Sequence, residues 1–385
     1  MTSISSRYSV LQRTIARPFP KRKEGSPSRR RRAILLVAAA VITGAAALAL
    51  GMWLAGDLSY SYIEMMSVGG INNVTAWGLS AFKLVMDVSS IGVIGLLLVC
   101  LLLPAGDREL GATALRCLRT ARWLALVWSV STAVLLVFSW SNVVGQPVTA
   151  LPLGKLFTDT ANTFPDASGF MTSTALALVI AVGVALTKTR RGALILLPLA
   201  VYGLVPMAIQ GNASHSSVIK WSVVVHVTAL SLWVGGLAAL VTHVRREPAQ
   251  LAVAVPRFST LAGVCYFAVA ASGIAGAAEM LDYTLPNLWG TRYGVVMMLK
   301  AGALITLGIC GWWHRRRTVP RIRAGQGSRA RRAFIRLAAA EVIVMLVAVA
   351  LGVALSRTSS PDMIEEYGRN AGMSSVHVQH PGIRG

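Results

Sequence analysis

Charged residues are scarce in this sequence of 385 residues, where they make up 14% of the chain. Soluble domains usually carry about 25% charged residues, so the shortage argues against a soluble globular domain. Acidic residues are the scarcest, since 15 Asp and Glu stand against 37 Lys and Arg and leave a formal net charge of +22. An excess of this size is typical of nucleic-acid-binding proteins, unless the positions of the basic residues explain it.

Catalytic motifs are missing as well. The sequence contains no P-loop, no Gly-x-Ser-x-Gly motif and no His-Glu-x-x-His motif, and we therefore expect no enzymatic activity. None of its few cysteines belongs to a Cys-x-x-Cys pair, so neither a disulfide nor a thiolate metal site is expected. We interpret the four as small core hydrophobes: Cys100, Cys117, Cys265 and Cys310.

Long apolar runs are what the sequence has in abundance, since 55% of its residues are hydrophobic. A run of about 20 apolar residues can cross the roughly 30 Å of a bilayer core as a helix. Continuous runs favour helices over a membrane barrel, whose strands alternate and are half as long. We therefore predict an all-α, polytopic helix bundle, multi-pass in the lipid bilayer of the cell membrane. The nine predicted transmembrane spans are 33–55, 81–103, 122–143, 170–188, 192–210, 218–242, 258–279, 294–313 and 334–356.

The basic residues are concentrated in alternate loops. Of the 37 Lys and Arg, 29 lie before the first predicted span and in the loops that follow the second, fourth, sixth and eighth spans. The positive-inside rule makes these segments cytoplasmic, so the N-terminus is predicted inside and the C-terminus outside. The excess charge then reflects topology, with attraction to anionic lipids as a by-product, and no nucleic-acid partner is expected.

The predicted spans divide the chain into four parts. Residues 1–32 are basic and rich in Ser and Pro, which is typical of a disordered cytoplasmic arm. Five spans fall in an N-terminal membrane region, 33–214, and four fall in a second membrane region, 215–357. The remaining residues, 358–385, are rich in Ser, Gly and His and are predicted to form a flexible extracytoplasmic tail.

Several ionisable residues interrupt the apolar runs, and such residues usually face the interior of a bundle and pair with one another. Lys83 and Asp87 are i,i+4 neighbours in the outer half of the second span. Lys300 lies roughly 9 Å deep in the eighth span, and Glu341 lies near the middle of the ninth. Because these two spans are consecutive, we predict a Lys300–Glu341 salt bridge that sets helix register. Asp87 remains an alternative partner for Lys300, as well as for Lys83.

His226 is the most informative residue, because a polar side chain inside the membrane is costly and usually serves a purpose. It lies about 12 Å below the outer surface in the sixth span. Three interpretations stay open: a hydrogen bond to a neighbouring helix, metal ligation, and proton relay or haem ligation. Imidazole with thioether would suit Cu(I), whereas carboxylates would favour harder or oxidised ions. The predicted metal set is His226, His215, Glu279 and Met280, with Met207, Asp282 and Met297 close to it in the predicted topology.

Trp233, Gly235 and Gly236 follow His226 in the same run. Small residues let membrane helices approach closely, so we predict that the two glycines mark a helix contact. Trp233, seven residues after His226, shares its face and is also interpreted as a packing residue.

The second membrane region resembles the copper resistance D (CopD) family of bacterial inner-membrane proteins. The resemblance begins at His226 with the pattern His-x6-Trp-Val-Gly-Gly and extends over roughly 215–357. The five spans of the N-terminal membrane region resemble the family only in their hydropathy, and long actinobacterial members carry such an N-terminal half. The residues that carry the resemblance are His226, Trp233, Gly235, Gly236, Arg257, Phe258, Ser259, Gly273, Thr291, Tyr293, Gly294, Lys300 and Glu341.

This resemblance implies a protein of copper uptake or copper tolerance, which moves copper ions or accepts them from the extracytoplasmic side. It implies copper as the bound metal, and a periplasmic copper-binding protein or oxidase assembly components as partners. Some long members continue into a second membrane domain that resembles an oxidase assembly factor, which this sequence lacks. Two alternatives remain: a non-transporting assembly factor for a respiratory oxidase, and a membrane redox protein that holds haem through His226.

Overall fold

The computed structural model describes residues 45, 46, 49, 73–104, 110–152, 154, 167–209, 216–281, 286–290, 292–320 and 327–355. All of these belong to one compact unit, residues 44–385. Within this part of the chain 92% of the residues are helical and no strand is present. The predicted all-α bundle is therefore confirmed.

Eight of the helices are long and apolar enough to cross a membrane, and they coincide with eight of the nine predicted spans. The other prediction, a span at 33–55, lies almost wholly outside the described residues. The long helices of the first region are α4 (Asn73–Leu102), α5 (Ala112–Val144), α7 (Ala167–Leu186) and α8 (Arg190–Ala208). Those of the second are α9 (Ser217–Ala239), α10 (Pro248–Met280), α12 (Arg292–Trp313) and α14 (Gly327–Leu355). The shorter elements are η1 (Val148–Ala150), α11 (Pro286–Gly290) and the π-helices η4 (Leu240–Val244) and η5 (His314–Thr318).

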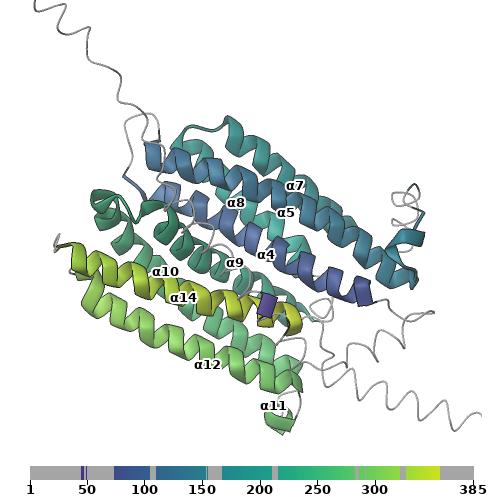
Figure 1. The fold of residues 1–385 in the computed structure, drawn as a ribbon. Coiled ribbons are helices and arrows are strands. Elements are labelled where there is room, and N and C mark those ends of the chain that lie inside the picture. The colour runs from purple at the N-terminus through teal and green to yellow at the C-terminus, as the bar shows by residue number, and fades with distance from the viewer. Residues whose placement is uncertain are drawn as a thin grey trace, which may run out of the picture. The chain divides into compact units, whose positions relative to one another are not determined.

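Helices α4 and α9 lie side by side in the middle of the bundle (Figure 1). Helices α5, α7 and α8 pack on one side of them, and α10, α12 and α14 pack on the other. Helix α4 is enclosed most completely, since 67% of its most apolar 18-residue stretch is buried. The corresponding stretches of α10 and α12 are each 17% buried. A helix that is apolar on all faces is suited to such a central position.

Arginine side chains from two other helices cap the C-terminal end of α4. Arg190 donates a hydrogen bond to the carbonyl of Leu101, and Arg257 donates one to the carbonyl of Leu102, each at 3.0 Å. The last carbonyls of a helix have no partner within the helix and carry a partial negative charge, so guanidinium groups stabilise them. These contacts bring the ends of α4, α8 and α10 together.

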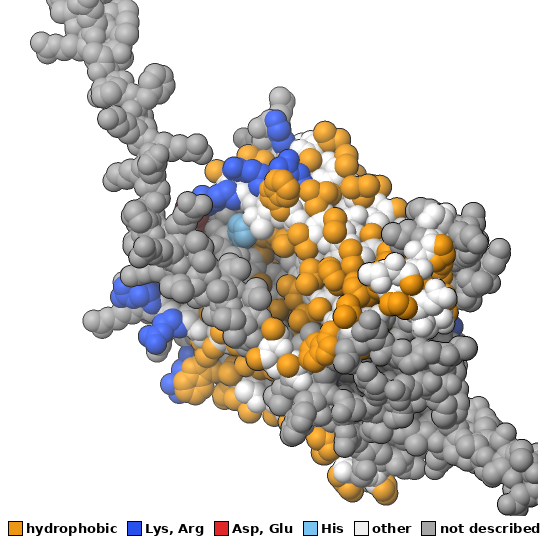
Figure 2. Space-filling model, turned by 45° about the vertical axis from the view of Figure 1, so that its right-hand side comes forward, with side chains coloured by type: hydrophobic (Ala, Val, Ile, Leu, Met, Phe, Trp, Pro, Cys, Tyr) orange, Lys and Arg blue, Asp and Glu red, His pale blue; other side chains and the backbone are white. Residues whose placement is uncertain are grey.

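The same end of the bundle gathers the other described basic loops. The amide of Leu110 donates to the carbonyl of Lys188 at 3.1 Å, and Arg116 forms an ion pair with Glu247 at 3.4 Å. The loops α4–α5, α7–α8 and α9–α10 therefore share one end, as the alternation of charge predicts, and we call it the basic end. Figure 2 shows the visible Lys and Arg side chains concentrated at one margin of a largely hydrophobic surface.

The contact between α4 and α9 depends on two glycines. A Cβ atom built on Gly235 would collide with the carbonyl oxygen of Ile91 and lie 3.0 Å from Cα and N of Gly95. A Cβ atom on Gly95 would in turn collide with the backbone of Gly235. The two backbones touch here, so the first glycine of the predicted Trp-Val-Gly-Gly contact has its partner in the first membrane region.

The neighbouring residues of this motif pack against α10. A Cβ atom on Gly236 would lie 2.5 Å from the ring of Phe258. Trp233 is buried, and its ring meets the ring of Tyr266 edge-on, with centroids 5.7 Å apart. One turn of α9 is therefore held between α4 and α10, which positions the rest of α9, including His226, against both regions of the bundle.

Candidate functional site

His226 lies on α9 and faces α10, where its Nδ1 atom is 3.1 Å from the hydroxyl oxygen of Ser272. That hydroxyl donates its own hydrogen to the carbonyl of Ala268 at 2.6 Å. A serine hydroxyl has one hydrogen to donate, so Ser272 accepts from Nδ1–H of the imidazole. In a neutral ring with its proton on Nδ1, the lone pair is on Nε2, which is then available to a metal ion or a proton.

Small residues allow α9 and α10 to hold this ring. The hydroxyl of Ser222, one turn before His226, donates to the backbone carbonyl of Ser272. A Cβ atom on Gly273 would lie 3.6 Å from Cε1 of His226, and one on Gly276 would lie 3.0 Å from the Ser222 hydroxyl. A side chain at Gly276 would press on Ser222, whereas a Cβ atom on Gly273 would be in ordinary van der Waals contact with the ring. Ser272 therefore sets the hydrogen bond of His226, and Gly276 permits the close approach of α9 and α10.

Lys300 of α12 lies at the same level of the bundle as His226. The ring of Tyr266 packs on Gly308, and α10 and α12 run in opposite directions from this contact. Eight residues along each helix, about 12 Å, bring Lys300 level with Ile274, the neighbour of Gly273.

The predicted Lys300–Glu341 salt bridge is wrong. A Cβ atom on Gly352 would lie 3.8 Å from Nζ of Lys300, so the ammonium group faces α14 at this glycine. Glu341 is buried eleven residues earlier on α14, about 16 Å away along the axis. The two helices are antiparallel neighbours as expected, but their register differs from the predicted one by about three turns.

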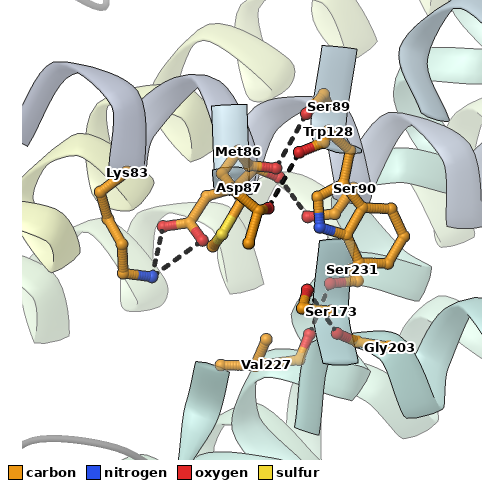
Figure 3. A network of polar contacts seen from close by, with 11 residues as sticks. Lys83, Met86, Asp87, Ser89, Ser90, Trp128, Ser173, Gly203, Val227 and Ser231 are labelled. Atoms are coloured by element: carbon orange, nitrogen blue, oxygen red, sulfur yellow. Dashed lines mark hydrogen bonds and ion pairs between the residues drawn. The ribbon is translucent and has the colours of Figure 1, made fainter. Parts of the chain in front are cut away.

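The alternative pairing of Asp87 with Lys83 is confirmed. The ammonium of Lys83 lies 3.0 Å and 3.2 Å from the two carboxylate oxygens of Asp87, and the two side chains are 30% and 21% exposed. Figure 3 shows the pair beside a series of buried hydroxyl groups. Among these, Ser89 and Ser90 donate to carbonyls of their own helix, which satisfies them in an apolar setting.

The predicted metal-binding residues do not converge on His226 within the described part of the chain. Met280 is buried eight residues beyond Ser272 on α10, about 12 Å from the level of His226, too far to share one ion. The adjacent Glu279 has a buried carboxylate oxygen without a hydrogen-bond partner. His215 lies outside the described residues. No three His, Cys, Asp or Glu side chains in the described helices come together as a metal site.

Met280 instead is buried in a small apolar cluster near the end of the bundle opposite to the basic end, and Met297 packs against this cluster. Ile219, Leu281, Val296 and Leu351 complete its buried part. Two thioethers, which are soft ligands, therefore lie about two turns from His226 on the side away from the basic end.

The described helices also bear on the haem interpretation. Besides His226, the part of the chain with described side chains contains one further membrane histidine, His243 in η4. It is hydrogen-bonded to Thr120 at 3.0 Å and to Thr242 at 2.8 Å. His226 and His243 are 17 residues apart on one continuous span, about 26 Å, so they cannot ligate one haem iron from two faces.

Comparison with known families gives a match to the model of copper resistance protein D over residues 252–355. The matched segment includes Lys300 and Glu341, and it covers most of α10 and all of α11, α12 and α14. The match begins 26 residues after His226, which therefore lies outside it. No curated protein and no solved structure matches the chain.

Proposed function

We propose that this protein binds copper at His226 and moves it across the cell membrane, from the end with Met280 and Met297 towards the basic end. Two findings support the proposal: residues 252–355 match the model of copper resistance protein D, and Ser272 holds His226 with Nε2 available as a ligand. The second is the observation on which the assignment of the site depends.

A single imidazole suits a transported ion better than a permanently bound cofactor. Conduction requires binding that is favourable enough to admit an ion and weak enough, or spread over enough sites, to release it. The cluster of Met280 and Met297 lies about two turns from the level of His226, on the side away from the basic end. Soft sulfur ligands followed by an imidazole favour Cu(I) over harder ions.

The proposed orientation follows from the charge of the loops. Cytoplasmic loops of membrane proteins carry an excess of Lys and Arg, so the basic end is assigned to the cytoplasm. Copper would then arrive at the methionine cluster from outside. A periplasmic copper-binding protein would be the donor, and oxidase assembly components would be the recipients.

Copper uptake into proteoliposomes of the purified protein tests the proposal. We expect His226→Gln to reduce the uptake of labelled Cu(I) at least tenfold, because the ligand is removed while a polar side chain remains near Ser272. His243→Gln is the matched control, since it changes the other described membrane histidine near the basic end, and it should retain uptake.

Three results would contradict this assignment. Equal uptake by the native protein and His226→Gln would show that His226 is not the copper site. Uptake no faster than in protein-free liposomes would exclude transport, and a reduced oxidase content in cells lacking the protein would then favour the assembly-factor alternative. A Soret band in the purified protein would favour haem.

A further inference from the structure

The end of α12 continues into a π-helical turn that carries three consecutive arginines. This turn is η5, and the side chains of Arg315, Arg316 and Arg317 are all exposed. Turns of π-helix are rare and occur frequently at functional sites. In the part of the chain that the structure describes, no ion pair joins any of the three guanidinium groups to a carboxylate. Three adjacent positive charges therefore lack a counter-charge among these residues.

Two of the guanidinium groups lie on tryptophan rings. Cζ of Arg316 is 4.7 Å from the centroid of the Trp312 ring, and Cζ of Arg317 is 4.4 Å from that of the Trp313 ring. A guanidinium group stacked on an aromatic face keeps the N–H donors at its edge available. Such donors match the oxygens of a phosphate group in pairs. The two tryptophans thus hold two sets of donors in place for an anion.

The third arginine places this turn on the side of the basic end. A Cβ atom on Gly263 of α10 would lie 2.9 Å from Nη1 of Arg315, so the glycine leaves room for the guanidinium group. Gly263 is six residues, about 9 Å, from Arg257, which caps α4 at the basic end. In the proposed orientation, η5 therefore lies near the cytoplasmic leaflet, where anionic phospholipids carry their headgroups.

An exposed apolar strip on α12 leads up to these arginines. Ile309 and Trp312 follow Ile305 by four and seven residues, which puts all three on one helix face, and all three are exposed. Helix α12 is also one of the helices least covered by the rest of the bundle. A free anion would gain nothing from this strip, whereas a phospholipid has acyl chains that can lie along it below the phosphate. The strip and the arginines together fit an amphiphile.

We propose that the end of α12 is a binding site for an anionic phospholipid of the cytoplasmic leaflet. Arg316 and Arg317 hold its phosphate, and its acyl chains lie along Ile305 and Ile309. Such a site differs from the general attraction of basic loops to anionic lipids, because it depends on which arginines are present and not only on their number. The site is independent of copper and goes beyond the proposed function.

Native mass spectrometry of the purified full-length protein in detergent tests the inference, with phosphatidylglycerol and phosphatidylcholine of equal acyl chains as probes. We expect the native protein to bind phosphatidylglycerol with an affinity about fivefold higher or more. Arg316→Gln with Arg317→Gln should lower that affinity about tenfold, because two charge-assisted partners of the phosphate are lost. Arg191→Gln with Arg246→Gln is the matched control, since it removes the same charge from exposed positions at the basic end, and it should retain the affinity.

Trp312→Leu with Trp313→Leu is a second variant, which keeps both charges. It removes the rings on which the guanidinium groups lie and should lower the affinity about threefold. Equal affinities of the native protein for the two lipids would overturn the inference. An equal loss in the two arginine double variants would also overturn it, because only a diffuse attraction would then be present. Displacement of phosphatidylglycerol by an excess of inorganic phosphate would indicate a site for a free anion and would equally contradict a phospholipid site.

Discussion

The contact of Gly235 with α4 allows a quantitative prediction for Gly235→Ala. The added methyl group would occupy the position of the Ile91 carbonyl oxygen and lie 3.0 Å from backbone atoms of Gly95. Because these are backbone atoms, no rotation of a side chain can relieve the collision, and α4 and α9 must separate. Overpacking a well-packed interior costs about 1–3 kcal/mol, and a backbone collision belongs at the upper limit.

A smaller effect of the opposite sign has to be subtracted. Alanine in a helix is more favourable than glycine by roughly 0.5–1 kcal/mol, because glycine loses more conformational freedom on folding. The net destabilisation is therefore about 2 kcal/mol. Thermal unfolding of the detergent-purified protein, followed by the loss of soluble monomer, should show a Tm lower by several degrees.

Gly302→Ala is the matched control for this prediction. It is the same substitution in another membrane helix, but nothing lies within 4 Å of the Cβ position. The gain in helix propensity should act alone, so its Tm should equal or slightly exceed that of the native protein. A Gly235→Ala protein as stable as Gly302→Ala would refute the claim that α4 and α9 touch at this residue.

Three further predictions follow from the packing and charge of the bundle. Lys83→Met should destabilise the protein by about 1–2 kcal/mol, because Asp87 keeps its charge without a partner. Adding Asp87→Leu should restore most of the lost stability in the same melting assay. Equal Tm values for the single and double variants would contradict the pairing. Arg257→Ala should cost about 1–2 kcal/mol through loss of the bond that caps α4, and an unchanged Tm would show that the cap contributes nothing. Gly111 and Gly154 are exposed and have open space at Cβ. A membrane-impermeant maleimide should react with Gly111→Cys from the inside of the cell and with Gly154→Cys from the outside. The reverse pattern would invert the proposed orientation.

Features that depend on one segment at a time could be predicted from the sequence. A membrane span requires only a run of apolar residues of sufficient length, so eight spans coincide with helices of the structure. The Lys83–Asp87 pair was among the open alternatives because i,i+4 neighbours share a helix face in any fold. The alternation of basic loops likewise depends on counting spans, and the described loops meet at one end as expected.

Features that depend on the alignment of two helices were missed or left open. The partner of Lys300 is decided by the register of α12 against α14, and a difference of three turns exchanges Glu341 for Gly352. Ser272, which sets the available nitrogen of His226, carries no signal of its own beyond its place before Gly273 in an apolar run.

Hydropathy and charge thus determine by themselves that this protein is a multi-pass helix bundle, which residues are buried at membrane depth, and which loops share one side. Each of these properties belongs to a single segment and its length. Only the tertiary structure decides that His226 meets Ser272, that Lys300 lies level with His226 and away from Glu341, and that Gly235 meets Gly95. The physical reason is that apolar helices can slide by whole turns against one another at little cost in burial, so close packing of small side chains selects the register.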